Sequence, residues 1–470
     1  MDKKIIAVAV AFMFSGCSAA ATYDGFEEPA QTVPAITQSS DTYRSELSEY
    51  ADDGIPDKCL ETVTSDDGIC TISKMEHYYD VTIDYENSTP AGAGRAYAQA
   101  VRKIFPNYDE IVEPYIYENI IIAFPALKDD YGPVEKRVTT LAASIREDSR
   151  EELYAMAEEM SGGYHGFAED GRMSYEEALA ASLIPEAMRG TACSALSLWG
   201  QKTESGDMIA ARLLDWNLGS NYQMCAIHAV LHAKKGERSY TGIGFLGLGS
   251  LISGINDNGV FGAILDLGSG DNIPYEYENK RCYTYELRYA LEEFDTAKEI
   301  GQYMVDNSGA FTWSHHIYLA DGKETYCAED AVAGLQRRGE GYSVLRDNNT
   351  PLMSSLHWDS PDSLCVVNAF ASEGNLDLWT SGANNYVRFF KYNDWVSSTD
   401  KFTVGSLKST LTQERVNLGS NDDEAQVNNV HNTGTSQMII VDYHTGNVQV
   451  AFTPATGPVD DPVFTDIGHF

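Results

Sequence analysis

The residues best suited to covalent chemistry are Cys193, Arg212 and Asp215. A cysteine thiol has a reference pKa of about 8.5, so it is mostly protonated at neutral pH. A nearby guanidinium favours the thiolate, which is the nucleophilic form. A carboxylate close by can orient a base or an amine. This group therefore predicts a nucleophilic cysteine supported by one cation and one anion.

Cleavage of the chain between Ala192 and Cys193 would make Cys193 the first residue of a mature catalytic piece. Its own α-amino group, with a reference pKa of about 7.7 to 8.0, could then act as the general base. Asp215 would hold that amine in place. Such a site needs no catalytic histidine.

A β-hairpin is the element expected to position this group, because two short apolar runs flank a glycine-containing turn. A turn centred near Glu204 would place Cys193 opposite Trp216 and beside Asp215. Residues three apart on a regular strand face opposite sides. Arg212 and Asp215 could both reach the thiol only if the strand bends or bulges. The two runs and the turn are residues 194–199, 208–214 and 203–207.

The sequences 193–200 and 212–216 together resemble the N-terminal-nucleophile (Ntn) cysteine hydrolases. They are most similar to the acyl-coenzyme A:isopenicillin N acyltransferase and phospholipase B-like group. Choloylglycine hydrolases and acid ceramidase are more distant relatives. The resemblance implies a self-cleaving chain with Cys193 as the nucleophile, supported by Arg212 and Asp215. It also implies a four-layer αββα sandwich.

Four further residues fall on positions that this resemblance associates with the oxyanion or the substrate. Asn256 lies in a turn similar to one of the family, and the family's late arginine matches Arg388 or Asn385. Asp266 stands where the family often has an asparagine that donates to the oxyanion. An ionised carboxylate cannot donate a hydrogen bond, so a protonated Asp266 or a backbone N–H would have to do so.

The order of the patterns predicts an α+β fold: helical periodicity before Cys193, then strands with helices inserted. The segment before the cysteine is therefore expected to be a folded helical layer. The predicted divisions are a signal peptide at 1–16, an acidic tether at 17–58, a mainly helical pro-segment at 59–192 and the Ntn catalytic domain at 193–470.

The first residues predict export. Lys3 and Lys4 precede an apolar run of about ten residues, which is too short to span a membrane. The run ends at Cys17 in a sequence that resembles a bacterial lipobox, in which the cysteine is lipidated. Acyl chains on Cys17 would anchor the protein in the cell envelope. Ser18 favours the outer membrane or the surface over the inner membrane.

A net charge of -37, from 70 acidic and 33 basic residues, argues against binding to nucleic acid. We expect no cofactor and no metal site, and His228 and His232 are expected to be structural. The expected partner is a small amphiphilic or acylated substrate. The two pieces should stay associated after cleavage, and a homo-oligomer is left open.

Three alternatives remain open at the level of sequence. Hydrolase and acyltransferase activity are not distinguished, nor are penicillin-type, bile-salt, N-acyl lipid, lactone and phospholipid substrates. The chain could also be a non-enzymatic surface lipoprotein with the same fold. A papain-like or transglutaminase-like thiol enzyme would need one of His315, His316 or His357. Cys59 and Cys70 form a plausible local disulfide.

Overall fold

A computed structural model describes residues 50–127, 130–188, 191–236, 238–267, 276–377, 383–413 and 430–470. The predicted signal peptide, Cys17 and the tether up to residue 49 lie outside the described residues, so export and lipidation stay predictions. Within the described ranges, no helix combines the length and apolar character that a membrane crossing requires.

One of the two β-sheets has seven strands and contains the Cys193 hairpin. β5 and β6 lie side by side in it as an antiparallel pair. The other strand pairs are antiparallel too, except that β1 runs parallel to β17. In order the strands are β1 (Ile55–Pro56), β17 (Phe464–His469), β16 (Asn447–Phe452), β15 (Thr435–Asp442), β6 (Ile209–Trp216), β5 (Thr191–Leu198) and β14 (Ser363–Val367).

The second sheet has ten strands and receives both halves of the chain. β4, from the part before Cys193, pairs parallel with β7 from the part after it. In order the strands are β13 (Val344–Arg346), β12 (Thr325–Asp330), β11 (His315–Ala320), β10 (Phe261–Asp266), β9 (Ser253–Asn256), β8 (Arg238–Phe245), β7 (His228–Lys235), β4 (Tyr79–Asp84), β3 (Cys70–Met75) and β2 (Cys59–Thr64).

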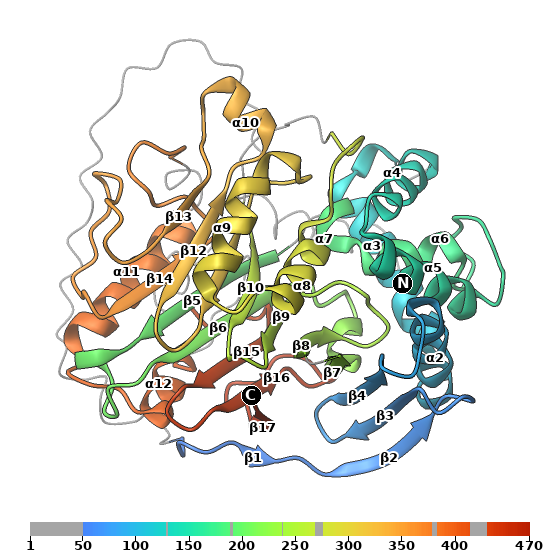
Figure 1. The fold of residues 1–470 in the computed structure, drawn as a ribbon, viewed down its shortest axis with the longest axis horizontal. Coiled ribbons are helices and arrows are strands. Elements are labelled where there is room, and N and C mark those ends of the chain that lie inside the picture. The colour runs from blue at the N-terminus through green and yellow to red at the C-terminus, as the bar shows by residue number, and fades with distance from the viewer. Residues whose placement is uncertain are drawn as a thin grey trace.

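The two sheets face each other, and helices cover their outer faces (Figure 1). Ser197 of β5 hydrogen-bonds Tyr318 of β11 across the shared core. Helices α11 (Ala383–Ser398) and α12 (Val404–Leu411) pack on the seven-stranded sheet. Helices α8 (Tyr283–Glu293) and α9 (Ala297–Asn307) pack on the ten-stranded sheet. The predicted α+β fold with four layers is confirmed.

Most of the remaining helices lie ahead of Cys193, and α2 to α6 gather at the right of the view in Figure 1. Two of their ends follow the expected signals. Gly162 ends α5 in the left-handed conformation, and Ser174 opens α6 with a capping box. These helices are α2 (Pro90–Ile104), α3 (Tyr108–Ala123), α4 (Gly132–Ala143), α5 (Glu147–Ser161), α6 (Tyr175–Ser182), α7 (Ile184–Ala187) and, later in the chain, α10 (Ala333–Arg338).

Strands β2 to β4 are a feature of the 59–192 segment that the sequence indicated only around residues 81–85. β2 is largely exposed, and in β3 the apolar alternation covers only residues 70–73, so the strand pattern of this hairpin is weak. That residues 59–192 are separated from the rest by cleavage stays a prediction.

The expected register of the β5–β6 hairpin is wrong by two residues. Cys193 pairs with Leu214 rather than with Trp216, because the strands end at Leu198 and Ile209. The connection is a ten-residue loop with a short 3₁₀ turn rather than a tight turn, so its centre lies earlier in the chain.

The expected disulfide between Cys59 and Cys70 is also wrong, since both thiols are free. The two cysteines lie on β2 and β3, which form a hairpin. Cys59 pairs with Met75 across this hairpin, whereas Cys70 pairs with Ile83 of β4 on the other side of β3. The two cysteines therefore lie at opposite ends of the hairpin.

Candidate active site

Cys193 lies near the start of β5 and faces the space between the two sheets. Its partner across the hairpin is Leu214, and two residues further along Ala195 pairs with Arg212. Directly paired residues share a face, as do residues two apart. Cys193 and Arg212 therefore lie on the same inner face as diagonal neighbours. Both are fully buried.

The Arg212 guanidinium contacts the cysteine directly. Its Nη2 lies 3.3 Å from Cys193 Sγ and also donates to the carbonyl oxygen of Ile264 at 3.0 Å. Nε and Nη1 have no hydrogen-bond partner among the described residues. A buried cation with unused donors beside a thiol is suited to stabilise negative charge there.

The backbone of Cys193 is held by Asn368, directly after β14, and by Arg388 of α11. Its N–H donates to Asn368 Oδ1 at 2.7 Å, and its carbonyl oxygen accepts from Arg388 Nη1 at 2.7 Å. Arg388 Nη2 bonds Asn368 Oδ1 at 2.9 Å and Asn385 Oδ1 at 2.7 Å. Asn385 Nδ2 returns a bond to the Asn368 carbonyl at 3.1 Å. The position of the Cys193 backbone is therefore fixed by a closed polar network.

Asp215 is fully buried, and its side chain lies on the outer face of the sheet. Residues three apart on β6 face opposite sides, so Asp215 points toward α11, where Arg388 Nη1 lies 3.5 Å from Oδ2. Thr435 Oγ1 donates to Asp215 Oδ1 at 2.8 Å. The neighbouring strand β15 bulges between Thr435 and Gln437. β6 itself pairs with β5 without a shift, so the bulge that would let Arg212 and Asp215 both face the thiol is absent from this strand, and only Arg212 reaches the sulfur.

The ionisation of the two central groups is set mainly by burial. Burial raises the pKa of the Cys193 thiol, the Arg212 charge lowers it, and the nearby Asp215 carboxylate raises it. Burial also raises the pKa of Asp215, while the Arg388 charge and a hydrogen bond from Thr435 lower it. The two arginines thus favour the charged forms that burial opposes.

Asp266 takes part through its backbone. It pairs with His315 in the sheet, and His315 stacks on Tyr283 of α8. Asp266 therefore shares the outer face with His315, away from Cys193. Its carbonyl oxygen accepts a hydrogen bond from Asn368 Nδ2. The hydrogen-bond donor near the cysteine is thus the Asn368 amide. Its bond goes to the backbone carbonyl of residue 266, so it does not require an asparagine side chain at that position.

Asn256 lies in the turn that joins β9 to β10. Its Oδ1 accepts from the backbone N–H groups of Asn258 and Val260 at 3.1 and 2.9 Å. Its Nδ2 donates to the carbonyl oxygens of Leu291 and Phe294, each at 3.1 Å. The first two bonds hold the turn together and the other two join it to the C-terminal end of α8, and none of the four involves Cys193.

The three histidines that a papain-like site would need have other partners. His315 Nε2 lies 3.1 Å from Asp330 Oδ2, and both side chains are fully buried. His316 packs against Phe370, and His357 lies at the surface beside Phe390. Among the described contacts of Cys193, none comes from a histidine.

Two site residues were missed by the sequence reasoning. Asn368 lies 175 residues after Cys193, directly behind the fully buried strand Ser363–Val367. A polar residue at the end of such a strand was the available signal. Thr435 opens the last hairpin and contacts Asp215 from the neighbouring strand. The distance in sequence between Asn368 and Cys193, or between Thr435 and Asp215, gives no indication that these residues are in contact.

No model of a known protein family matches the chain, and no curated protein is similar in sequence. Solved structures give a weak likeness. An N-acylethanolamine-hydrolyzing acid amidase ortholog from Caenorhabditis elegans is 14% identical, with a TM-score of 0.35, over 53% of this chain and 92% of that one.

Two bacterial structures are similar to the same degree. Penicillin V acylase from Agrobacterium tumefaciens is 12% identical, with a TM-score of 0.33, over 56% of this chain and 84% of that one. A variant of conjugated bile acid hydrolase from Clostridium perfringens is 12% identical, with a TM-score of 0.35, over 59% and 98%. At these TM-scores the likeness carries no conclusion about the site.

Proposed function

We propose that the protein is a self-cleaving Ntn thiol hydrolase that cuts a linear amide or ester through an acyl-enzyme on Cys193. The observation that carries this proposal is the surrounding of Cys193. Its sulfur contacts Arg212 at 3.3 Å, and its backbone N–H binds Asn368 Oδ1 at 2.7 Å. An uncharged structural cysteine needs no guanidinium beside its sulfur.

The first proposed reaction is cleavage of the chain itself. The Cys193 thiol adds to the carbonyl carbon of Ala192, and the C–N bond between the two residues breaks. The thiol proton passes to the departing nitrogen, which becomes the α-amino group of Cys193. Water then hydrolyses the thioester and frees the thiol. Asn368 Oδ1, which holds this nitrogen as an amide, can hold it as an amine.

The second proposed reaction is turnover of substrate. The freed α-amino group takes the thiol proton, and the thiolate attacks the acyl carbon. Arg212 stabilises the thiolate, while Asp215 and Asn368 orient the amine. The Nδ2 group of Asn368 is suited to donate to the developing oxyanion, exchanging its bond to the Asp266 carbonyl. Water, or an acceptor amine, then takes the acyl group.

The test starts from purified full-length protein, wild type and Cys193→Ala, and mass analysis of both. We expect two pieces that meet between Ala192 and Cys193 in the wild type and an uncut chain in the variant. A panel of chromogenic acyl amides and esters, with and without an acceptor amine, then identifies the substrate and distinguishes hydrolysis from acyl transfer. An active protein with an intact Ala192–Cys193 bond would contradict the mechanism.

We also propose that the protein is exported and held in the bacterial cell envelope by acyl chains on Cys17. The support is the short positively charged and apolar start of the chain. Metabolic labelling with a fatty acid, comparing wild type with Cys17→Ser, tests this. Equal labelling of both would contradict it.

A further inference from the structure

The short link between β1 and β2 is where the chain passes from one sheet to the other. β1 belongs to the seven-stranded sheet and β2 to the ten-stranded sheet, and only Asp57 and Lys58 separate them. The Lys58 carbonyl accepts from the N–H of Glu76, in the turn between β3 and β4, at 3.1 Å. The link is therefore held against that turn.

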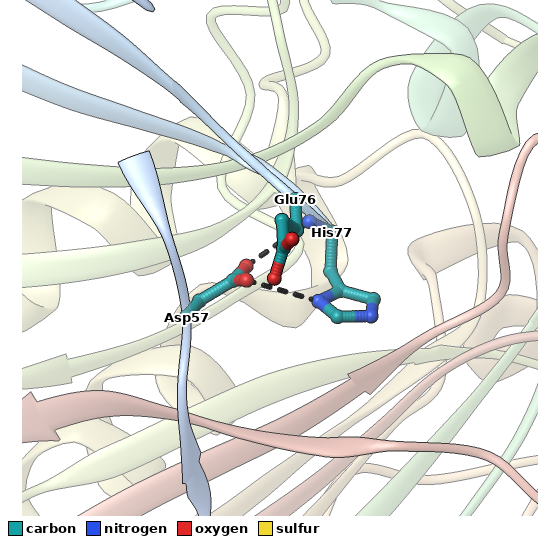
Figure 2. Close-up of side chains that lie close together, drawn as sticks. All are labelled: Asp57, Glu76 and His77. Atoms are coloured by element: carbon teal, nitrogen blue, oxygen red, sulfur yellow. Dashed lines mark hydrogen bonds and ion pairs between the residues drawn. The ribbon is translucent and has the colours of Figure 1, made fainter. Parts of the chain in front are cut away.

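Asp57, Glu76 and His77 bring their side chains together at this point (Figure 2). Asp57 Oδ1 lies 3.1 Å from His77 Nδ1, and Asp57 Oδ2 accepts from the His77 backbone N–H at 3.0 Å. One potential ligand atom from each of the three side chains lies within 4.8 Å of the other two. Two carboxylates and an imidazole nitrogen thus converge from two separate segments.

His77 is the basic side chain that contacts Asp57, and its imidazole carries a charge only when it is protonated. The Asp57 side chain is only 1% exposed, yet within the described ranges no lysine or arginine forms an ion pair with Asp57 or Glu76. Buried carboxylates are normally paired with a cation or bound to a metal ion. Glu76 brings a second carboxylate close to Asp57.

We propose that Asp57, Glu76 and His77 bind one divalent transition-metal ion, of which zinc is the best match. An imidazole ligand favours zinc over calcium or magnesium, and carboxylate oxygens complete a mixed N/O set. His77 ligates through Nδ1, with its proton on Nε2. Glu76 is exposed and can turn inward, while Asp57 is already fixed by the backbone.

The bound ion acts as a structural clamp. It joins the β1–β2 link to the β3–β4 turn and so holds the crossing between the two sheets. An ion that binds the folded chain and has no such site in the unfolded chain raises the melting temperature. This role is independent of the chemistry at Cys193 and does not rest on the proposed function.

The experiment uses the full-length protein, freed of metal with a chelator and titrated with zinc chloride by calorimetry. We expect one zinc ion per chain and a rise in melting temperature. Asp57→Asn and His77→Gln should each weaken binding by at least about tenfold, since each removes a ligand. His444→Gln is the matched control, because His444 pairs with the single carboxylate of Asp207 at the surface. It should bind zinc as the wild type does.

Two measurements keep the test decisive. Glu76→Gln alters an exposed side chain, so the variant should fold as the wild type does, and its zinc binding should be weaker. Circular dichroism checks that each variant is folded. Cobalt substituted for zinc should give a visible spectrum without a thiolate charge-transfer band, which excludes Cys59 as the ligand. Unchanged binding in Glu76→Gln and His77→Gln, or a thiolate band, would overturn the proposal.

Discussion

At the scale of single residues, Arg212 is the charge that most favours ionisation of the buried Cys193 thiol. Burial raises the pKa of the thiol, and the Arg212 charge is the strongest influence acting against it. Arg212→Gln removes this charge, so the pKa of the thiol should rise. Each unit of increase lowers the thiolate fraction at neutral pH by about tenfold. The pH dependence of chain cleavage and of kcat/KM should show its acidic limb at higher pH.

Arg346→Gln provides the control for this prediction. Arg346 is also buried, but its guanidinium binds Glu329 and the carbonyl oxygen of Cys365. Its loss should lower stability without moving the acidic limb. An unchanged limb in Arg212→Gln would show that the contact with the sulfur has no electrostatic effect on the reaction.

The site shows which residues sequence reasoning can reach. Cys193 and Arg212 were brought together by local pairing in one hairpin, which short-range patterns describe well. Arg388 was reached only through a family resemblance. Asn368 was not reached, because β14 is placed beside β5 by the packing of the whole sheet. No short-range pattern encodes such a pairing.

At the scale of elements, helices and strands differ in how well their details could be predicted. The helix ends at Gly162 and Ser174 follow from local capping chemistry. The register of β5 and β6 depends on the loop between them. Because Gly200 adopts a positive φ and starts a 3₁₀ turn, the loop is longer than its composition indicated. A hairpin's existence is thus easier to predict than its register.

Helix α7, just before Cys193, contains a fully buried acid with an unusual pKa. Burial raises the pKa of Glu186 to about 7, although Thr284 donates two hydrogen bonds to it. The ordinary value is 4.5. Between these two values the unfolded chain releases the proton and the folded chain keeps it. Stability should therefore fall as pH rises from 4.5 to about 7 and then level off.

Glu186→Gln tests this expectation because glutamine keeps an acceptor for Thr284 and cannot ionise. The variant should match the wild type near pH 4 and exceed it above neutral pH, by up to about 3 kcal/mol. Urea unfolding across this range measures the difference. A wild type whose stability is as constant with pH as that of the variant would show that Glu186 ionises in the folded chain as readily as in the unfolded chain.

At the scale of the whole molecule, both sheets are shared by the parts before and after Cys193. β1 pairs with β17 in one sheet, and β4 pairs with β7 in the other. Cleavage after Ala192 breaks neither pairing. We expect the two pieces to elute together in gel filtration and to separate only in denaturant. Separate elution under native conditions would contradict this expectation.

Because each sheet contains strands from both sides of Cys193, the chain folds most readily before any cleavage. Before cleavage, β4 finds β7 within one chain. After the proposed cleavage, the same pairing would require two molecules to meet, with a bimolecular rate that depends on concentration. The cleaved protein would then persist because it unfolds slowly, and an unfolded copy would not readily re-form. If the chain is cleaved as proposed, only the uncut form would fold by pairing within one chain, and unfolding of the cleaved form would be effectively irreversible.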